Sequence, residues 1–379
     1  MKNVKILGGG PAGLYGAYLI RRNFPDANVT VFEQNDAHTT FGFGVVFSDR
    51  ALEFLGADDP ETLSLITAGL ERWSDIELRV GGERIRIDGV GFTAIARLQL
   101  LEILRERALS VGANIVSSTV IRDLSELGDA DLIIGADGVN SLVRKTHEKQ
   151  FGTDIQLLSN RFAWFGAKRT FDYLTQTFKK LEQGSFNAHH YRYTSSMSTF
   201  LVEVDEKTFE RVGFGQMTEE QSREYCQEIF ADVLDGAELV TNKSLWRRFP
   251  VVSNKNWIAG NCVLVGDALR TAHFSIGSGT RLALEDMQSL SQALAKHPTN
   301  VIDGLAEFEG QRRPIVEKLA EAAKRSATWY DHFSEHLELP PMEFAMSYIG
   351  RSGRIDIDRL RAMSPEFVAQ YEKFRSSVS

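Results

Sequence analysis

Cysteine, basic charge and long apolar runs are all scarce in this sequence. Only Cys226 and Cys262 occur among 379 residues, so neither a disulfide framework nor a metal site is expected, and a reducing, cytoplasmic setting fits best. The formal net charge of −8 argues against a nucleic-acid-binding protein, which usually carries a basic excess. No run of about 18 apolar residues occurs, so no membrane-spanning helix is expected.

The first 20 residues, MKNVKILGGGPAGLYGAYLI, combine a basic tip with apolar side chains, as a signal peptide does. Glycines interrupt the apolar run, however, and no small-x-small cleavage site follows. We therefore expect folded structure here. With 43% hydrophobic and 25% charged residues, the chain has an ordinary globular composition and is long enough for two domains.

A glycine motif is the first feature that points to chemistry. Gly8, Gly10 and Gly13 form G-x-G-x-x-G between a short apolar run and a helical pattern. Such glycines permit a tight turn, a close approach of backbone to a pyrophosphate, and tight helix–strand packing. Glu33 follows about 20 residues later, where a carboxylate can accept hydrogen bonds from a ribose. This βαβ context predicts a dinucleotide site; the alternative is a turn that serves only packing.

Periodicity predicts the rest of the organisation. A helix is expected over 97–112, a strand after it, and strand, turn and helix over 131–145. Residues 41–50 are expected to be a glycine-bearing loop, and Gly81-Gly82 to turn a hairpin. Alternating, aromatic-rich segments from 151 to 260 predict an inserted antiparallel sheet. "CVLVGDA" at 262–268 predicts a return to a buried strand, and 300–379 is largely helical.

Three later stretches occur in a telling order. Arg97 opens "RLQLLEIL", "GADGVNSLVR" spans 135–144, and "GDALRTAHFSIGSGT" spans 266–280. Together they resemble the group A flavoprotein aromatic hydroxylases, the 4-hydroxybenzoate hydroxylase superfamily. The resemblance implies an α/β fold: a Rossmann-like (GR2-type) FAD-binding domain, an inserted antiparallel-sheet substrate domain and C-terminal helices. The expected segments are 1–150, with a hairpin insertion at about 75–95, then 151–260, 261–300 and 301–379.

The resemblance also implies FAD held at both ends, the pyrophosphate by the first glycine turn and the flavin ring by the second. One departure is that the family usually has proline where this chain has His273-Phe274-Ser275. For Asp137 the alternative is a turn-forming Asp-Gly pair without a ligand. The expected FAD-binding residues are Gly8, Gly10, Pro11, Ala12, Gly13, Glu33, Gln34, Gly44, Val45, Arg97, Val120, Asp137, Gly138, Asp267, Ile276, Gly277, Gly279 and Thr280.

The implied reaction is aromatic hydroxylation. NADH or NADPH would reduce the flavin transiently, O2 would add, and a C4a-hydroperoxyflavin would transfer oxygen to the ring. "FGFGVVFSDRALEFL" and "HFSIGSGTRLALED" most resemble the acyl-CoA branch, which includes salicylyl-CoA 5-hydroxylases forming gentisyl-CoA, and also the violacein-pathway hydroxylase. The alternatives are a tryptophan-derived, indolic or other free aromatic substrate, a reductase on the same scaffold, and a non-catalytic flavin-binding protein.

The substrate face is expected on a strand over 187–204. By alternation His189, Tyr191 and Tyr193 share one face and would assist ring deprotonation. Val46 and Phe47 would exclude water. For each, ordinary core packing is the alternative. CoA phosphates would need cations. The expected substrate-binding residues are Arg169, Arg192, Arg247 and Arg248, with Lys168 nearby, and His273 and Phe274; solvated surface is the alternative for the charged ones.

The C-terminal helices are expected to pack against the parent domain, with a dimer face as the alternative. Leu319, Ala322, Ala323 and Trp329 are apolar, but charged residues are interspersed among them. The sequence therefore allows a monomer or a homodimer.

Overall fold

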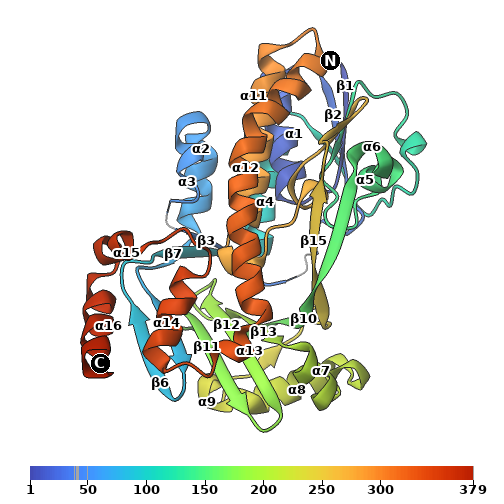
Figure 1. Cartoon of the computed structure of the whole chain (residues 1–379). Helices are drawn as coiled ribbons and strands as arrows, with labels where there is room; N and C mark the ends of the chain where they lie inside the picture. The colour runs from blue at the N-terminus through green and yellow to red at the C-terminus, as the bar shows by residue number, and fades with distance from the viewer. Residues whose placement is uncertain (38, 40–41, 49, 379) are drawn as a thin grey trace.

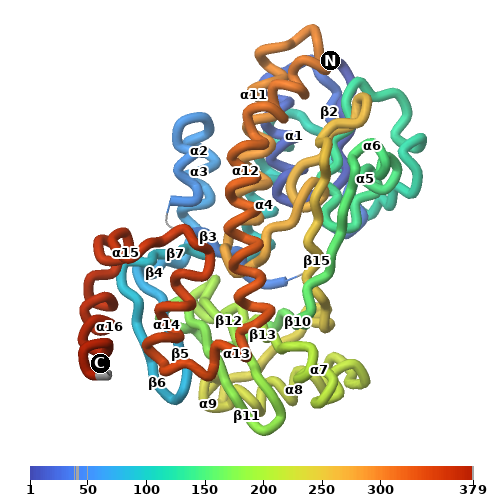
Figure 2. The backbone as a smooth tube through the Cα atoms, in the orientation of Figure 1, coloured from blue at the N-terminus to red at the C-terminus, as the bar shows by residue number. Residues whose placement is uncertain are grey.

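The computed structural model describes residues 1–37, 39, 42–48 and 50–378. Two halves, each built on its own large sheet, are joined by extended segments and by one long helix, α12 (Val301–Asp331), which runs along both (Figure 1). The tube in Figure 2 shows two further links, the long strands β10 (Thr153–Ala167) and β15 (Arg247–Asn254), which pair with each other in antiparallel register.

The first half is built on six short strands in the order β16-β17-β9-β1-β2-β8. All neighbours are parallel except β16 and β17. Ile6, Val31 and Ile134 are fully buried, as a parallel sheet covered on both faces requires. The predicted α/β fold is confirmed. The strands are β1 (Asn3–Leu7), β2 (Asn28–Phe32), β8 (Asn114–Val116), β9 (Leu132–Gly135), β16 (Ile258–Ala259) and β17 (Cys262–Leu264).

Helices cover this sheet, and two of them approach each other closely. A Cβ added at Gly16 would lie 2.3 Å from Cε of Met287, so the glycine lets the first helix pack tightly against the helix that carries Met287. The helices of this half are α1 (Pro11–Asn23), α2 (Glu53–Asp58), α3 (Pro60–Ala68), α4 (Arg97–Ser110), α5 (Leu142–Thr146), α6 (Glu148–Phe151), α10 (Gly266–Leu269) and α11 (Gly279–Lys296), with 3-10 turns η1 (Leu124–Leu127) and η3 (Phe274–Ile276).

The second half is built on an eight-stranded sheet. Its order is β14-β10-β13-β12-β11-β5-β6, with β15 paired to β10. All pairs are antiparallel except β5 with β11. The predicted hairpin is therefore confirmed as β5–β6, and the chain enters this sheet well before residue 150. The remaining strands are β5 (Ile76–Val80), β6 (Glu83–Ile87), β11 (Leu174–Leu181), β12 (Gly184–Arg192), β13 (Ser198–Val204) and β14 (Leu239–Val240).

Helices cover both faces of the larger sheet. On one face Phe200 packs against Phe230 beside α7 (Glu206–Val212), η2 (Phe214–Gln216), α8 (Glu219–Ile229) and α9 (Ala231–Leu234). On the other, Phe178 packs against Trp329 and Phe344. That second cover consists of α12, α13 (Phe333–His336), α14 (Pro341–Gly350), α15 (Ile357–Met363) and α16 (Pro365–Val378). The C-terminal helices thus pack on their own chain, and the proposed segment boundaries at 150, 260 and 300 stay predictions.

Two local predictions were wrong. Residues 187–204 form not one strand but two, β12 and β13, because Thr194 Oγ1 accepts from the backbone N–H of Met197 at 3.0 Å and turns the chain. Residues 41–50 were expected as a loop, yet β3 (Gly44–Ser48) pairs with β7 (Phe92–Ala96), and β7 also pairs with β4 (Glu71–Trp73). The valines and the phenylalanine of β3 favour a strand. Phe41 and Asp49 of that stretch lie outside the described residues.

None of the helices in the described ranges combines the length and the apolar character that spanning a bilayer requires.

A buried carboxyl group in β13 leads to a pH prediction. Burial raises the pKa of Glu203 to about 8, although Asn160 Nδ2 donates to it at 2.8 Å. From about pH 5 to about pH 8 the folded chain keeps a proton that the unfolded chain releases. The unfolding free energy should therefore fall with rising pH, by up to about 1.4 kcal/mol per pH unit from this group.

Urea unfolding across this pH window tests the prediction. Glu203→Gln should flatten the slope, whereas Glu206→Gln, at an exposed carboxylate, should leave it as in the parent protein. An unchanged slope in Glu203→Gln would contradict the assignment.

Candidate active site

The first glycine turn lies at the carboxyl end of β1. Gly8 has φ +101°, and a Cβ there would lie 2.3 Å from the carbonyl oxygen of Ala136; a Cβ at Gly13 would lie 1.8 Å from that of Gly8. Only glycine fits either position. Gly10 differs, because a Cβ there would meet nothing within 4 Å. The open side of the turn thus exposes the start of α1, which has no side-chain cap.

The second glycine turn, after β17, is fixed by a buried ion cluster. The backbone N–H of Gly266 donates to Asp286 of α11 at 3.1 Å. The same carboxylate accepts from Arg270 at 2.8 and 3.0 Å and from Arg312 of α12 at 3.0 Å. Asp286 is fully buried. Its charge is therefore paired and hydrogen-bonded, as burial requires, and the turn is tied to two helices.

A cavity of about 120 Å³ separates the two turns. α1 and α11 both begin at it, and neither start has a side-chain cap. Unpaired N–H groups at two helix N-termini make this a site for anionic groups. The Asp267 carboxylate faces the cavity opposite Arg97, and burial raises the pKa of this carboxyl. The lining residues are Gly10, Pro11, Ala12, Arg97, Ala136, Gly138, Val265, Gly266, Asp267, Gly279, Thr280 and Ala283.

Glu33 lies beside the first turn. Its carboxylate accepts from the backbone N–H of Gly9 and of Asn35, each at 2.7 Å. Gln34 is exposed, and Val120, 48% exposed, follows Thr119, whose N–H donates to the backbone of Glu33. These residues form an open surface next to the start of α1.

Asp137 is already used within the protein. Its Oδ2 accepts from the backbone N–H groups of Leu142 and Val143 at 2.6 and 3.4 Å, which caps the start of α5. Burial raises the pKa of Asp137, and its Oδ1 has no partner in the described part of the chain. Gly138, with φ +72°, lines the cavity. The turn-forming interpretation thus describes what Asp137 does here, and a ligand contact stays a prediction.

A second cavity of about 230 Å³ lies on the other side of the turn formed by residues 276–279. It brings β3, β7, the larger sheet and the C-terminal helices together. His189, 7% exposed, lines it, and the Nε2 atom of this ring has no hydrogen-bond partner among the described residues. Burial lowers the pKa of His189 to about 3, so the ring is neutral at neutral pH. The apolar and aromatic lining includes Val46, Ile76, Val90, Phe92, Leu174, Phe274, Ile276, Tyr348, Ile349 and Ile355.

Other predicted site residues lie outside this lining. Tyr191 donates its hydroxyl to the carbonyl oxygen of Gly44 at 3.0 Å, and Tyr193 packs where a Cβ on Gly44 would lie 2.6 Å away. Both therefore hold β3 against the sheet. Phe47 and Val45 point into the core of the first half. His273 is buried, with Nδ1 2.8 Å from Ser275 Oγ, and burial lowers the pKa of His273 to about 3.

The predicted substrate arginines also lie elsewhere. Arg192 pairs with Glu71 at 2.8 Å and donates to backbone carbonyls. Arg248 donates to the carbonyl of Leu158, and Arg247 is exposed on β15. Among the described residues, the lining of the His189 cavity includes none of Arg169, Arg192, Arg247 and Arg248. They were predicted from local charge alone, which does not reveal the pairing of Arg192.

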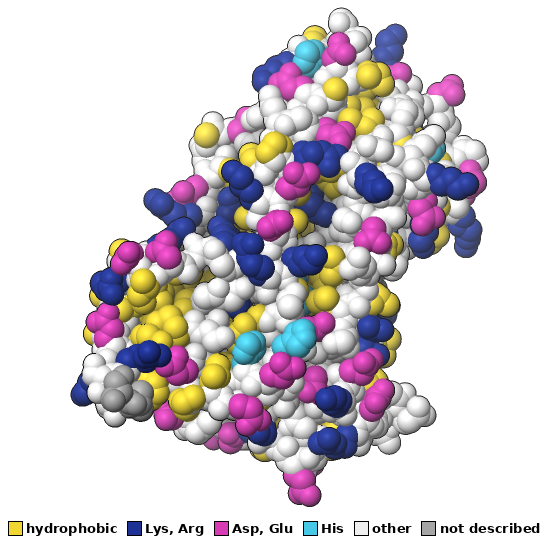
Figure 3. All heavy atoms as spheres, viewed as in Figure 1, with side chains coloured by type: hydrophobic (Ala, Val, Ile, Leu, Met, Phe, Trp, Pro, Cys, Tyr) yellow, Lys and Arg dark blue, Asp and Glu magenta, His cyan; other side chains and the backbone are white. Residues whose placement is uncertain are grey.

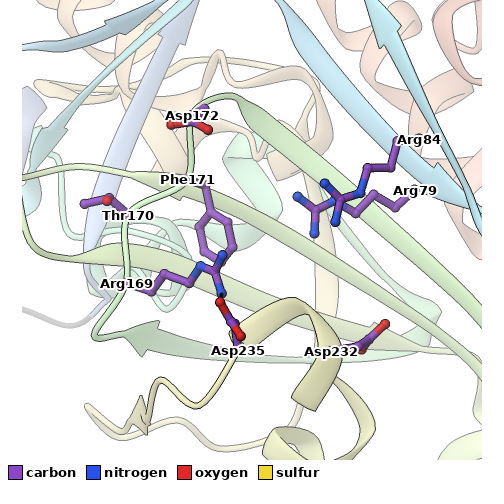
Figure 4. A pocket seen from close by; sticks show the side chains of 8 residues that line it. All are labelled: Arg79, Arg84, Arg169, Thr170, Phe171, Asp172, Asp232 and Asp235. Carbon is purple, nitrogen blue, oxygen red and sulfur yellow. Dashed lines mark ion pairs between the residues drawn. The ribbon is translucent and has the colours of Figure 1, made fainter.

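Arg169 belongs to a different pocket, beside α9. It pairs with Asp235 at 3.4 Å, and Arg79 and Arg84 extend toward the same space from β5 and β6 (Figure 4). Lys168 pairs with Glu238 at 2.6 Å. Because Asp172 and Asp232 also line this pocket of about 320 Å³, its charges are mixed.

The sequence analysis missed the arginines that do line the His189 cavity: Arg281, Arg351, Arg354 and Arg359. Arg351 holds the turn before α11, since it donates to the carbonyl of Ser275 at 2.9 Å and to Ser326 Oγ at 3.1 Å. For Arg351, Arg354 and Arg359 the only signal is the basic spacing of "RSGRIDIDR" at 351–359, which lies beyond the stretches that carry the resemblance, whereas Arg281 lies within one of those stretches, "HFSIGSGTRLALED".

Comparison with known proteins decides the family. The FAD binding domain model matches residues 95–323. This chain belongs to that family of flavoprotein aromatic hydroxylases. It is 39% identical to a salicyloyl-CoA 5-hydroxylase of Streptomyces sp, over 92% of this chain and 69% of the relative. It is also 34% identical to a 3-hydroxy-4-methyl-anthranilyl-[aryl-carrier protein] 5-monooxygenase of Streptosporangium sibiricum, over 92% and 94% of the two chains.

The solved structure of 2-methyl-3-hydroxypyridine-5-carboxylic acid oxygenase, in a tetrameric form, shares the fold, with a TM-score of 0.71 at 19% identity over 96% of both chains. The chain is therefore an FAD-dependent aromatic monooxygenase, of a family in which NAD(P)H is the typical reductant. The predicted family, fold class and cofactor are confirmed.

The Asp286 cluster leads to a stability prediction. Asp286→Asn removes the charge that neutralises Arg270 and the Nε of Arg312, and breaking a buried pair costs about 3–5 kcal/mol. We expect that loss in urea unfolding, together with weaker FAD binding measured by flavin fluorescence. Asp303→Asn, at an exposed position at the start of α12, is the matched control. Equal effects of the two variants would contradict a special role for the cluster.

Proposed function

We propose that this protein hydroxylates the ring of an aromatic acid presented as a thioester, with salicyloyl-CoA, converted by 5-hydroxylation to gentisyl-CoA, as the leading substrate. The observation that carries the proposal is the second cavity, which runs from a buried apolar pocket at His189 to a rim of arginines. The apolar part of the lining suits an aromatic ring, and the arginines suit an anionic carrier attached to it. Two relatives act on thioesters, one on CoA and one on a carrier protein.

The residues present fit FAD. The open side of Gly10 and the uncapped start of α1 suit the pyrophosphate, and Glu33 with the nearby Val120 suits the adenosine. Asp267 and Arg97 suit the ribityl chain. The Ile276–Gly277 turn and the start of α11, at Gly279 and Thr280, suit the flavin ring, whose negative charge on reduction a helix N-terminus stabilises. Gly44 and Val45 would act through the position of β3.

When bound and reduced, FAD supplies the activated oxygen, with O2 and NAD(P)H as co-substrates. The chain's own residues position the ring. Neutral His189 can accept a hydrogen bond at Nε2 from a ring hydroxyl or amine, which increases electron density on the ring. Val46, Phe92 and Phe274 exclude water from the reacting face. Because both cysteines are buried free thiols, we place the reaction in the cytoplasm.

Turnover with matched substrates tests the proposed function. Salicyloyl-CoA, 2-aminobenzoyl-CoA, the free acids and an indolic acid would be compared for flavin reduction by NADH and NADPH, O2 uptake and gain of one oxygen by mass spectrometry. We expect the CoA thioesters to stimulate reduction and gain oxygen. Turnover of a free acid or indole instead would overturn the thioester proposal, and NAD(P)H oxidation without O2 uptake would indicate a reductase.

His189 leads to a pH prediction. Its pKa is lowered to about 3, so it does not change charge between about pH 5 and pH 8. His189→Leu should lower kcat/KM roughly tenfold through the lost hydrogen bond while keeping the shape of the pH profile. His332→Leu, at an exposed ring, is the control. If kcat/KM of the parent enzyme falls on the acidic side with a midpoint near pH 6.5, and this fall disappears in His189→Leu, then His189 titrates and the proposed role is wrong.

A further inference from the structure

The rim of the substrate cavity carries charge that the protein leaves uncompensated. Arg281 pairs with Glu285 at 2.7 Å, and Arg351 uses its guanidinium on Ser326, Tyr348 and Ser275. In the described part of the chain, neither Arg354 nor Arg359 has a carboxylate within 4.0 Å. The pKa of Arg354 is lowered by burial and by the neighbouring charges of Arg359 and Arg281. Like charges placed near one another at the rim favour the binding of an anion there.

The position of these arginines along the cavity indicates which anion. Arg354 and Arg359 are exposed, whereas His189 at the other end is 7% exposed. The lining of the same cavity also includes apolar side chains, among them Ile355 and Ile349. Lys and Arg side chains gather beside α12 on the face shown in Figure 3, between the two halves. An aromatic ring at the buried end would thus be attached to an uncharged arm, with anionic groups at the mouth.

Hydrogen bonds hold the chain segment that carries the rim arginines. The carbonyl of Ser352 accepts from Arg325 Nε at 2.9 Å, and Gly353, with φ +66°, lets the chain turn against that guanidinium. Asp356 caps α15 by accepting from the backbone N–H of Arg359 at 2.8 Å. The backbone that carries the two arginines is therefore held by its own hydrogen bonds, and Arg359 Nη1 also donates to the carbonyl oxygen of Arg354 at 3.4 Å.

We propose that Arg354 and Arg359 bind the phosphate groups of the thioester carrier, the 3′-phospho-ADP part of CoA. The inference rests on the proposed function, because the ring must enter the same cavity. Guanidinium groups bind phosphates through paired, charge-assisted hydrogen bonds. The carboxyl group of the aromatic acid carries no charge in a thioester, so it gives no reason for two unpaired arginines at the exposed end.

A comparison of two thioesters of one acid tests the inference. Kinetics of salicyloyl-CoA and salicyloyl-pantetheine, which lacks the phosphates, would be measured for the parent enzyme, Arg354→Gln, Arg359→Gln and the double variant. The parent should prefer the CoA thioester, and each single variant should reduce that preference, as the ratio of kcat/KM values, roughly tenfold through KM. Arg361→Gln is the matched control, since Arg361 pairs with Asp358 and Glu372 outside the cavity lining.

Binding of CoA alone separates this inference from the proposed function. Calorimetry should show tighter binding to the parent than to either variant, and the difference should shrink at high salt. If CoA binds in this way but no thioester is hydroxylated, the proposed function fails and the phosphate site stands. If the variants bind CoA as the parent does, or lose both thioesters equally, the phosphate site is wrong. If only a thioester on a carrier protein depends on these arginines, the partner is that protein and not CoA.

Discussion

The carboxylate of Asp286 holds the second glycine turn, α11 and α12 together. It is fully buried, and it accepts from the Gly266 backbone, Arg270 and Arg312. These donors come from the second glycine turn and from α12, while Asp286 belongs to α11. Because a buried charge must keep its partners, the three segments hold one relative arrangement. The tight α1–α11 packing at Gly16 then brings both helix starts to one cavity.

The His189 cavity is assembled from segments that are distant in the sequence. β3 supplies Val46, β12 supplies His189, the turn before α11 supplies Phe274 and Ile276, and α14 with its following loop supplies Tyr348 and Arg354. Tyr191 connects β12 to β3 through its hydrogen bond to the carbonyl oxygen of Gly44. Arg351 connects the loop after α14 to the turn before α11 through its hydrogen bond to the carbonyl oxygen of Ser275. The His189 cavity therefore shares part of its lining with the turn before α11, so a displacement of either half would change the shape of this cavity.

The sequence was most informative where backbone geometry restricts residue choice. Gly8 and Gly13 could be assigned because only glycine fits those positions, and Asp267 and Gly279 followed from the ordered motifs. The side of His189 followed from alternation in β12. Arg354 and Arg359 could not be found in this way, since their importance depends on a chain turn that brings residues 350–359 to β3 and β7. The ion pair of Arg192 could not be foreseen for the same reason: its partner Glu71 is 2.8 Å away but distant along the chain.

α12 connects the two halves of the molecule. In the first half of the helix Arg312 donates to Asp286, and at the C-terminal end Asp331 accepts from the backbone N–H groups of Ser159 and Asn160 in β10 at 3.2 and 3.0 Å. A rotation of the second half against the first half must therefore bend α12 or break one of these two sets of hydrogen bonds. Pro314 lies inside it and cannot donate the hydrogen bond that its position in a helix requires. The missing hydrogen bond thus lies two residues from Arg312, so a bend of α12 at Pro314 would leave the Asp286 contact in place and move the end that carries Asp331, together with the larger sheet.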